Sequence, residues 1–348
     1  MKRVIVGNVE IGEGLPPLLI AEIGLNHNGS MELAKQMIKA AVHSGAHVVK
    51  FQKRDPAALA TSCFLDAPFL KCPLFGRTQR EVRTKLEFNE TQLADLKEYA
   101  ESYGTIFSMS VFDEPSLKIA QSLNLDFIKI ASHSVTNLPF LKLVSHVQKP
   151  VFLSMGASTW SERDAAVACL RNCPLVVLHC VSAYPCPDSV VNLGTIQKIQ
   201  TRYNCVVGYS GHEKDILPSV IAVAKGASVI ERHFTLNRSM IGLDHKLSLV
   251  PTEFSTLADS IARVPGLLGE VADILPEEMA ARTNYHVSVC AAVNLKAGTV
   301  LSQDKLLCKQ PLGDAMVNFS GAEFDSLIGK KLKRDIAGDS AIPRDAVE

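Results

Sequence analysis

The feature that most constrains this chain is an eightfold alternation of short apolar runs with amphipathic helical runs. Apolar runs rich in β-branched and aromatic residues predict strands at residues 18–23, 47–52, 105–111, 127–132, 151–155, 175–181, 205–210 and 228–234. Helical periodicity predicts helices at residues 30–44, 89–103, 114–123, 139–147, 161–170, 193–203, 215–225 and 251–268. Strands that are apolar on both faces belong to parallel sheets, and eight β/α repeats suffice to close one into a barrel. We therefore expect an α/β fold, a (β/α)8 TIM barrel.

An open, doubly wound sheet is the structural alternative. The first predicted strand runs into Glu-Ile-Gly-Leu-Asn-His-Asn-Gly at residues 22–29, and not into the Gly-x-Gly-x-x-Gly of dinucleotide-binding folds. This difference favours the barrel. One connection, residues 53–88, is unusually long, contains three prolines and shows no convincing periodicity. Because ordinary βα loops are short, we interpret it as a functional flap or a local insertion, whose basic residues contact an anion or are solvated.

The sequence changes character after the last repeat. Short β-type runs and frequent glycines replace the long helical runs, beginning near residue 285. We predict a barrel domain at residues 1–275, a linker at residues 276–284 and a small β-rich domain at residues 285–348.

Composition argues against several classes of protein. Lys plus Arg and Asp plus Glu both number 36, so the formal net charge is zero and no attraction to nucleic acid or membranes is expected. No apolar run is long enough for a signal peptide or a membrane span. The nine cysteines are odd in number and lie mostly in apolar contexts, which is typical of free thiols in a reducing compartment. We therefore expect a cytoplasmic protein.

Polar side chains stand at or just beyond the end of every predicted strand. In chain order they are Glu22, Lys50, Gln52, Ser110, Lys129, Ser132, Ser154, Ser182, Tyr184, Ser210, His212, Glu231 and His233. The carboxyl ends of barrel strands meet at one face, where the active sites of this fold lie. The pattern therefore predicts a polar pocket at that face.

Several of these residues allow more than one interpretation. His212 and His233 follow neighbouring strands and could hold a metal ion, or they could be two unrelated rim histidines, since no short-range ligand motif is present. Lys50 and Lys129 interrupt apolar strands, which indicates a cradle for phosphate and carboxylate groups, buried Lys–Glu pairs, or a Schiff-base lysine. Glu22 is either a general acid/base or a salt-bridged core residue.

Seven motifs in order resemble the sialic acid synthase family, which includes N-acetylneuraminate synthase and its legionaminate, pseudaminate and spore-coat relatives. They are AEIGLNHNG at residues 21–29, VKFQ at 49–52, KIAS at 129–132, LSMG at 153–156, HCVSAYP at 179–185, GYSGH at 208–212 and ERHFT at 231–235. The tail, with LKAGT at residues 295–299 and LIGKKL at 327–332, is similar to the antifreeze-like (SAF) domain of that family. The resemblance covers the whole barrel and the tail.

The resemblance implies condensation of phosphoenolpyruvate with an N-acylmannosamine-like sugar aldehyde, giving a sialic-acid-type 3-deoxy-2-keto acid and phosphate. It implies Mn²⁺ or Mg²⁺ held by His212 and His233, with Glu22 near the reacting carbon, in a domain-swapped homodimer. Phosphoenolpyruvate would be held by Lys50, Ser110, Lys129, Ser132, Ser154, Ser182 and Ser210, and the sugar side would involve Gln52, Tyr184 and Asp244.

Departures from the family pattern concentrate on the sugar side. Many sialate synthases have Gly followed by Glu or Asp after the serine of the KIAS-type motif, whereas this chain has His133 and Ser134. Gln310 stands where bacterial members carry an SAF arginine that reaches the N-acyl group, and we expect it to contact the acceptor. A legionaminate-, pseudaminate-, spore-coat- or octulosonate-type acceptor, or a non-catalytic sugar-binding paralogue, remains an alternative.

Overall fold

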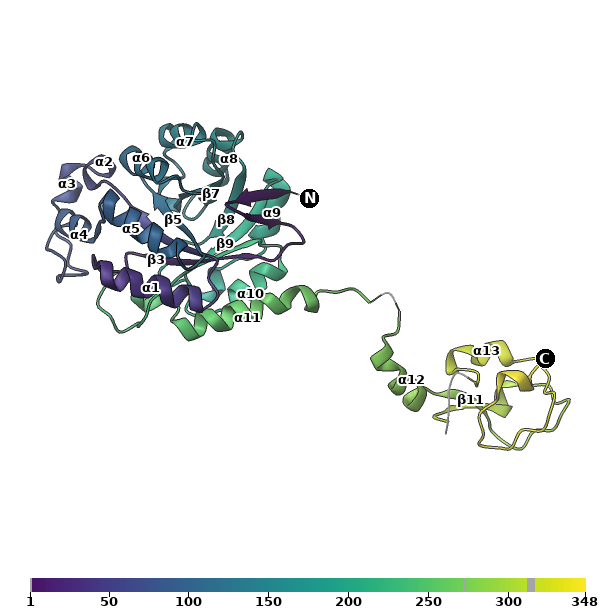
Figure 1. The fold of residues 1–348 in the computed structure, drawn as a ribbon. Helices are drawn as coiled ribbons and strands as arrows, with labels where there is room; N and C mark the ends of the chain where they lie inside the picture. The colour runs from purple at the N-terminus through teal and green to yellow at the C-terminus, as the bar shows by residue number, and fades with distance from the viewer. Residues whose placement is uncertain (1, 272, 312–316) are drawn as a thin grey trace. The chain divides into compact units, whose positions relative to one another are not determined.

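The computed structural model describes residues 2–271, 273–311 and 317–348, which form two compact units divided after residue 268. In the first unit, eight parallel strands close a barrel in which β10 hydrogen-bonds to both β9 and β3 (Figure 1). The strands are β3 Leu18–Gly24, β4 Val48–Lys53, β5 Ile106–Val111, β6 Ile128–Ile130, β7 Val151–Ser154, β8 Leu175–Cys180, β9 Val206–Gly211 and β10 Val229–His233. Closure confirms the barrel and excludes the open sheet.

The predicted helices surround the barrel. They are α1 Met31–His43, α5 Glu90–Glu101, α6 Glu114–Ser122, α7 Leu138–Ser145, α8 Trp160–Leu170, α9 Thr195–Tyr203, α10 Leu217–Ala224 and α11 Pro251–Leu267. Helix α1 begins where Ser30 accepts a hydrogen bond from the Leu33 N–H. Helix α8 begins one residue earlier than predicted, because Thr159 and Glu162 form a capping box there. At these helices, hydrogen bonds with capping side chains set the first residue, which lies within one residue of the predicted start.

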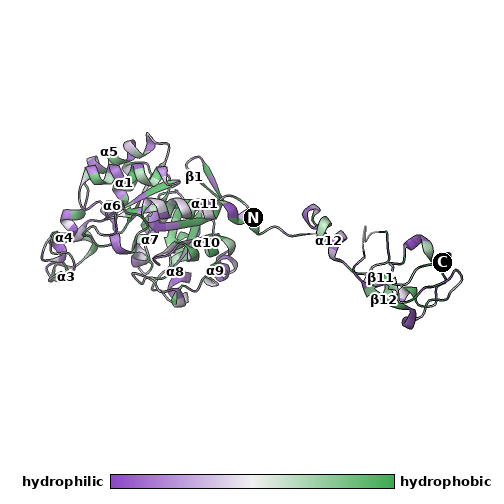
Figure 2. Cartoon of the chain, turned by 90° about the horizontal axis from the view of Figure 1, so that it is seen from below, coloured by the Kyte–Doolittle hydropathy of each residue, from purple (hydrophilic) through white to green (hydrophobic). Residues whose placement is uncertain are grey.

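Apolar side chains fill two layers of the barrel unit. One layer lies between the strands and the helices, and the other fills the barrel floor around Leu18, Phe127 and Phe152. A hairpin that the sequence analysis did not predict, β1 Arg3–Val6 and β2 Val9–Gly12, packs its apolar residues into the floor cluster. Figure 2 shows the hydrophobic colour gathered on the central strands and hydrophilic colour on peripheral helices such as α4 and α9. Polar side chains occupy the other end of the barrel, where the strands have their carboxyl ends.

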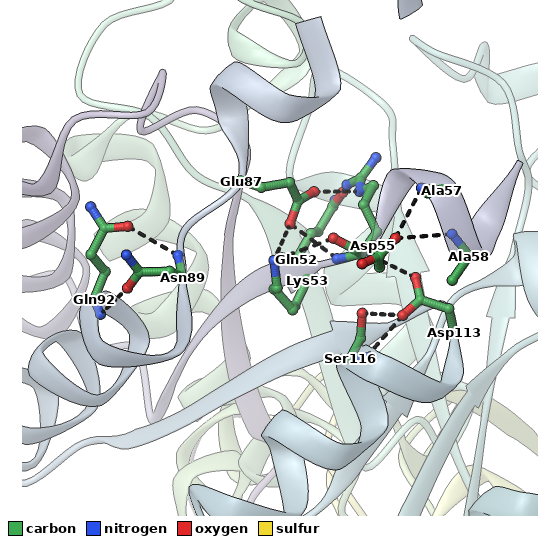
Figure 3. A network of polar contacts seen from close by, with 11 residues as sticks. Gln52, Lys53, Asp55, Ala57, Ala58, Glu87, Asn89, Gln92, Asp113 and Ser116 are labelled. Atoms are coloured by element: carbon green, nitrogen blue, oxygen red, sulfur yellow. Dashed lines mark hydrogen bonds and ion pairs between the residues drawn. The ribbon is translucent and has the colours of Figure 1, made fainter. Parts of the chain in front are cut away.

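The long connection after β4 is an ordered insertion. It contains α2 Pro56–Leu59, α3 Ser62–Leu65 and α4 Gln79–Leu86, and a small apolar cluster of its own around Phe75 and Val82. Its two ends are clasped together, because Lys53 and Arg54 both pair with Glu87, at 3.1 and 3.0 Å (Figure 3). The clasp fixes the residues that follow β4 at the rim of the barrel.

The second unit has its own core. Its strands β11 Ser288–Ala291 and β12 Leu306–Lys309 pair antiparallel, and short helical turns including α13 Phe324–Leu327 cover a buried apolar cluster. The segment predicted as a linker contains most of helix α12 Met279–Tyr285. Among the described residues, no helix is both long enough and apolar enough to cross a bilayer.

Gly208 on β9 provides a test of the barrel packing. A Cβ there would overlap Cδ2 of Leu178 and lie 2.7 Å from the Val229 carbonyl oxygen. Gly208→Ala should therefore lower the free energy of unfolding of the barrel by about 1–3 kcal/mol. Gly194→Ala, at a position with no atom within 4 Å, should change it by less than about 0.5 kcal/mol. Urea unfolding followed by the fluorescence of Trp160 measures both, and equal stability of the two variants would contradict the packing.

Candidate active site

The predicted polar residues converge at the carboxyl ends of the barrel strands. A deep cavity of about 60 Å³ is lined by Glu22, Lys50, Gln52, Ser110, Lys129, Ser132, Ser154, Tyr184, Ser210, His212, His233, Cys180 and Glu231. An outer cavity of about 580 Å³ shares Gln52, Ser132, Tyr184 and His233 with it, and adds Ser182 and Asp244. Gln310 belongs to the second unit, where its exposed amide donates to the Asn284 carbonyl. Every other predicted residue lines one of these two cavities.

Two lysines and two glutamates form a buried network in the deep cavity. Lys50 Nζ contacts Glu22 Oε2, lies 3.6 Å from Glu231 Oε2 and donates to Ser110 Oγ at 2.9 Å. Lys129 Nζ lies 3.6 Å from Glu231 Oε1 and donates to Ser154 Oγ at 2.8 Å. The prediction of buried Lys–Glu pairs is therefore confirmed, with Glu231 placed between the two lysines.

The ionisation of this network follows from burial and from the paired charges. Burial alone would raise the pKa of Glu231, but Lys129 and Lys50 lower it to about 2. Burial lowers the pKa of Lys129 and outweighs the attraction of Glu231. For Lys50, the attraction of Glu22 and Glu231 outweighs burial and raises the pKa. Lys129 is therefore the less fully compensated lysine and the one better placed to gain from an added anion.

Hydroxyl groups gather around Gly156, just beyond β7. The Gly156 N–H donates to Ser132 Oγ at 2.8 Å. A Cβ at this position would overlap Ser182 Oγ and lie 2.9 Å from Ser132 Oγ and 3.1 Å from Cys180 Sγ. Only glycine therefore leaves room for the two hydroxyls to converge beside Lys129. Hydroxyls and an ammonium group in this arrangement suit a phosphate or a carboxylate.

The two histidines lie side by side, with ring centroids 5.6 Å apart. His212 Nδ1 lies 3.0 Å from the Val181 carbonyl oxygen, so Nδ1 carries the proton and Nε2 keeps its lone pair. Burial, followed by the charge of His233, lowers the pKa of His212 to about 3. The buried Nδ1 of His233 has no hydrogen-bond partner among the described residues.

Two imidazoles in one polar cavity fit a divalent metal ion. Within residues 2–271, 273–311 and 317–348, no group of three or more His, Cys, Asp and Glu side chains is placed to hold a metal. His212 and His233 are therefore the two side chains here that would hold a metal ion.

The outer cavity contains residues that the sequence analysis missed as site residues, including Arg54, Phe112, Thr136 and Ser158. The Arg54 guanidinium lies over the Phe112 ring at 4.8 Å and hydrogen-bonds to Gln52 Oε1. Arg54 is only two residues beyond Gln52, so its position just after the second predicted strand was a signal for a residue at the rim. Tyr184 stacks near His212, with ring centroids 4.2 Å apart.

Comparisons with known proteins agree with this architecture. The profile of the NeuB family matches residues 37–273, and that of the SAF domain matches residues 286–348. The chain is 34% identical to human N-acetylneuraminate-9-phosphate synthase, over 97% of this chain and 94% of that protein. It is 33% identical to N,N'-diacetyllegionaminic acid synthase of Campylobacter jejuni, over 93% of this chain and 98% of that protein.

A solved structure gives the same result. The sialic acid synthetase of Leptospira borgpetersenii, in complex with citrate, superposes with a TM-score of 0.70 at 30% identity, covering 82% of this chain and 97% of that one. These matches confirm the resemblance on which the sequence analysis relied.

The shared carboxylate of Glu231 yields a stability prediction. Glu231→Gln should lower the free energy of unfolding near neutral pH by about 3–5 kcal/mol, because it leaves buried positive charge uncompensated. Adding Lys129→Met should recover part of the loss, since the unpaired charge is then removed as well. Urea unfolding followed by Trp160 fluorescence measures both variants.

The stability difference between the parent and Glu231→Gln should change with pH in a definite direction. The pKa of Glu231 is lowered in the folded state, so its contribution is present above the unfolded value of about 4.3 and is lost as the pH falls toward 2. The stability difference between the parent and Glu231→Gln should therefore shrink below about pH 4.3. A difference that is small at neutral pH, or that grows in acid, would contradict the pairing.

Proposed function

The chain belongs to the NeuB family, and from this premise we propose that it condenses phosphoenolpyruvate with an N-acylmannosamine-like sugar aldehyde. The products are a sialic-acid-type 3-deoxy-2-keto nonulosonic acid and phosphate, and the protein is a C–C bond-forming transferase. The observation that carries the proposal is the placement of a lysine–serine cradle and two histidines in one cavity at the barrel mouth.

The cradle would hold phosphoenolpyruvate through its phosphate and carboxylate. Lys129 with Ser132, Ser154 and Ser182 supplies donors on one side, and Lys50 with Ser110 supplies them on the other. Ser210, whose hydroxyl donates to Glu231, holds that carboxylate beside the cradle. These groups do no covalent work, so a Schiff-base role for either lysine is not needed. Their contribution is to fix the enol carbon where an aldehyde can meet it and to balance the charge that develops.

In the proposed condensation, Glu22 acts on the water that adds to C2. The C2–C3 π electrons of phosphoenolpyruvate attack the aldehyde carbon, forming the C–C bond, leaving positive charge at C2 and turning the aldehyde oxygen into an alkoxide, which is protonated to the product hydroxyl by a proton that the added water releases. Water adds at C2, and the C2–O bond to phosphate then breaks, so that phosphate leaves with the bridging oxygen. Glu22, held by Lys50 and by Gln52 at 2.8 Å, is positioned to orient this water and to accept its proton.

His212 and His233 are the residues that would hold Mn²⁺ or Mg²⁺. When bound, the ion would supply Lewis-acid polarisation of the aldehyde. The histidines would contribute imidazole nitrogens, and the Val181 carbonyl fixes the orientation and tautomer of His212.

Turnover should therefore depend on a divalent metal. Exhaustive chelation should abolish phosphate release from phosphoenolpyruvate and aldehyde, and Mn²⁺ or Mg²⁺ should restore it. His212→Ala should remove activity at every metal concentration while leaving urea unfolding close to that of the parent, because truncating a ligand at the cavity wall opens no core void. His47→Ala, at an exposed histidine outside both cavities, is the control for loss of an imidazole. Full activity after chelation would refute the metal role.

A different acceptor within the same reaction class is the second candidate. His133 and Ser134 stand where many sialate synthases have an acidic residue, and His133 lines the outer cavity. Legionaminate-, pseudaminate-, spore-coat- and octulosonate-type acceptors are therefore the alternatives to test by phosphate release. A non-catalytic sugar-binding paralogue is less well supported, because Glu22, Lys50, Lys129 and both histidines converge in one cavity.

A homodimer whose partner SAF domain completes the acceptor site is also part of the proposal. Apolar side chains exposed along residues 267–287, including Leu267, Val271, Leu275 and Tyr285, support an association surface. Light scattering should give a dimer, and truncation after residue 278 should leave a folded barrel with a raised KM for the acceptor. A monomer with normal turnover would contradict it.

A further inference from the structure

Behind the two histidines, on the side of the barrel wall that faces the helices, lies a buried ion pair that the proposed chemistry does not use. Arg232 precedes His233 in the chain, and Glu213 follows His212. Arg232 Nη1 lies 3.0 Å from Glu213 Oε1, and each side chain is 1% exposed. Because side chains alternate between the faces of a strand, Arg232 points into the same outer layer as Ile230, whereas His233 lines the deep cavity. We call Arg232 and Glu213 the rear ion pair.

The packing around the Glu213 carboxylate is specific. The Tyr209 hydroxyl donates to Glu213 Oε2 at 2.8 Å. A Cβ on Gly211 would lie 2.6 Å from Glu213 Oε1 and 2.7 Å from Cε1 of Tyr209, so glycine leaves the room that the carboxylate occupies. Arg232 Nη1 also donates to Ser219 Oγ on α10, at 2.9 Å. Apolar residues of the same size would be about as stable as a buried ion pair, so the particular contribution of this pair is a fixed geometry.

The rear ion pair begins where the backbone pairing of β9 and β10 stops. The last register pair joins Arg232 to the final residue of β9, and His233 and His212 each follow by one residue. Beyond that point the Arg232 side chain continues the connection. Its Nη2 donates to the Glu213 carbonyl oxygen, and its Nη1 donates to the Asp215 carbonyl oxygen at 2.8 Å. Arg232 thus ties the end of β10 to the segment that carries His212.

The two histidines are otherwise held from different sides. The His212 ring is anchored to the Val181 carbonyl oxygen, which follows β8. The His233 carbonyl oxygen accepts from the Leu249 N–H at 2.8 Å, but its buried ring Nδ1 has no hydrogen-bond partner among the described residues. The placement of the His233 ring therefore depends on the backbone that carries it. Arg232, its neighbour in the chain, anchors that backbone to the end of β9.

Building on the proposed metal role, we propose that the rear ion pair is a positioning pair, which fixes the separation of the His212 and His233 rings and so sets the affinity for the divalent ion. Neither Arg232 nor Glu213 lines either cavity, so the pair acts through the backbone and not by contact with a substrate. Partners that orient metal ligands commonly change metal affinity by about 10–100-fold when they are removed.

The test replaces the rear ion pair without leaving a buried charge unpaired. Arg232→Met combined with Glu213→Gln removes both charges and nearly keeps the volume of both side chains, so the barrel should stay folded. In calorimetry without substrates, the dissociation constant for Mn²⁺ should rise at least about tenfold in this double variant. Arg232→Lys keeps the charge but loses the forked donors, and it should give a smaller rise.

Leu141→Ala is the control for a general loss of stability. Leu141 is fully buried on α7, which follows β6 on the other side of the barrel from β9 and β10. This truncation should lower the urea midpoint, because it opens a cavity in the core. It should leave the Mn²⁺ dissociation constant within about twofold of the parent value, because it moves neither histidine-bearing strand.

The outcomes separate this proposal from the proposed function. A parent-like Mn²⁺ dissociation constant in the folded double variant, or an equal rise in Leu141→Ala, would overturn the positioning role while the condensation stands. If the double variant does not fold, the same measurement on Arg232→Lys decides, since a parent-like value there also overturns the role.

Two further results bear on the proposed function itself. If the parent binds no Mn²⁺ but still releases phosphate from phosphoenolpyruvate and an aldehyde, the metal role and the positioning role both fail and the condensation stands. If no aldehyde releases phosphate, although Mn²⁺ binds and the double variant weakens its binding, the condensation fails and the positioning role stands.

Discussion

The site depends on the neutralisation of two lysines on the inner wall of a barrel. Removing an ammonium group from water costs several kcal/mol even after relaxation, so neither Lys50 nor Lys129 is tolerated there without a carboxylate. Glu231 lies between them and Glu22 contacts Lys50, which accounts for four buried charges in one layer. The same pairing holds each side chain in place before substrate arrives. Structural pairing of the lysines is therefore observed, and it is compatible with the proposed binding of an anion by the same network.

Closure of the barrel distributes different chemistries around its mouth. Strands β6 to β8 bring hydroxyl groups and a glycine into contact, β9 and β10 bring two imidazoles, and β4 leads into Arg54 at the rim. The clasp at Glu87 connects the insertion to this arrangement, because Arg54 belongs to both. Apolar packing closes the floor and leaves the polar groups open at one end. A single scaffold thus brings buried lysines, hydroxyl groups and two histidines to the same space.

Much of this could be predicted from the sequence because strand periodicity and strand ends are local signals. The eight strands, and the convergence of residues such as Lys129 and Ser154, follow from the rule that parallel barrel strands end at one face. The β1–β2 hairpin was missed because its strands are only four residues long. The role of Glu231 between two lysines depends on register across non-adjacent strands, which no local pattern reveals. The pairing of Lys53 and Arg54 with Glu87 depends on how the insertion folds back, which no local pattern reveals either.

The most direct test of the central claim follows the oxygen that bridges C2 and phosphorus in phosphoenolpyruvate. The substrate is labelled with ¹⁸O at that position and turned over with the preferred aldehyde, and mass spectrometry locates the label. If the cavity holds phosphoenolpyruvate for attack by C3 and addition of water at C2, the label leaves in the inorganic phosphate. Recovery of the label in the keto acid would mean that the P–O bond breaks instead, and would contradict the account.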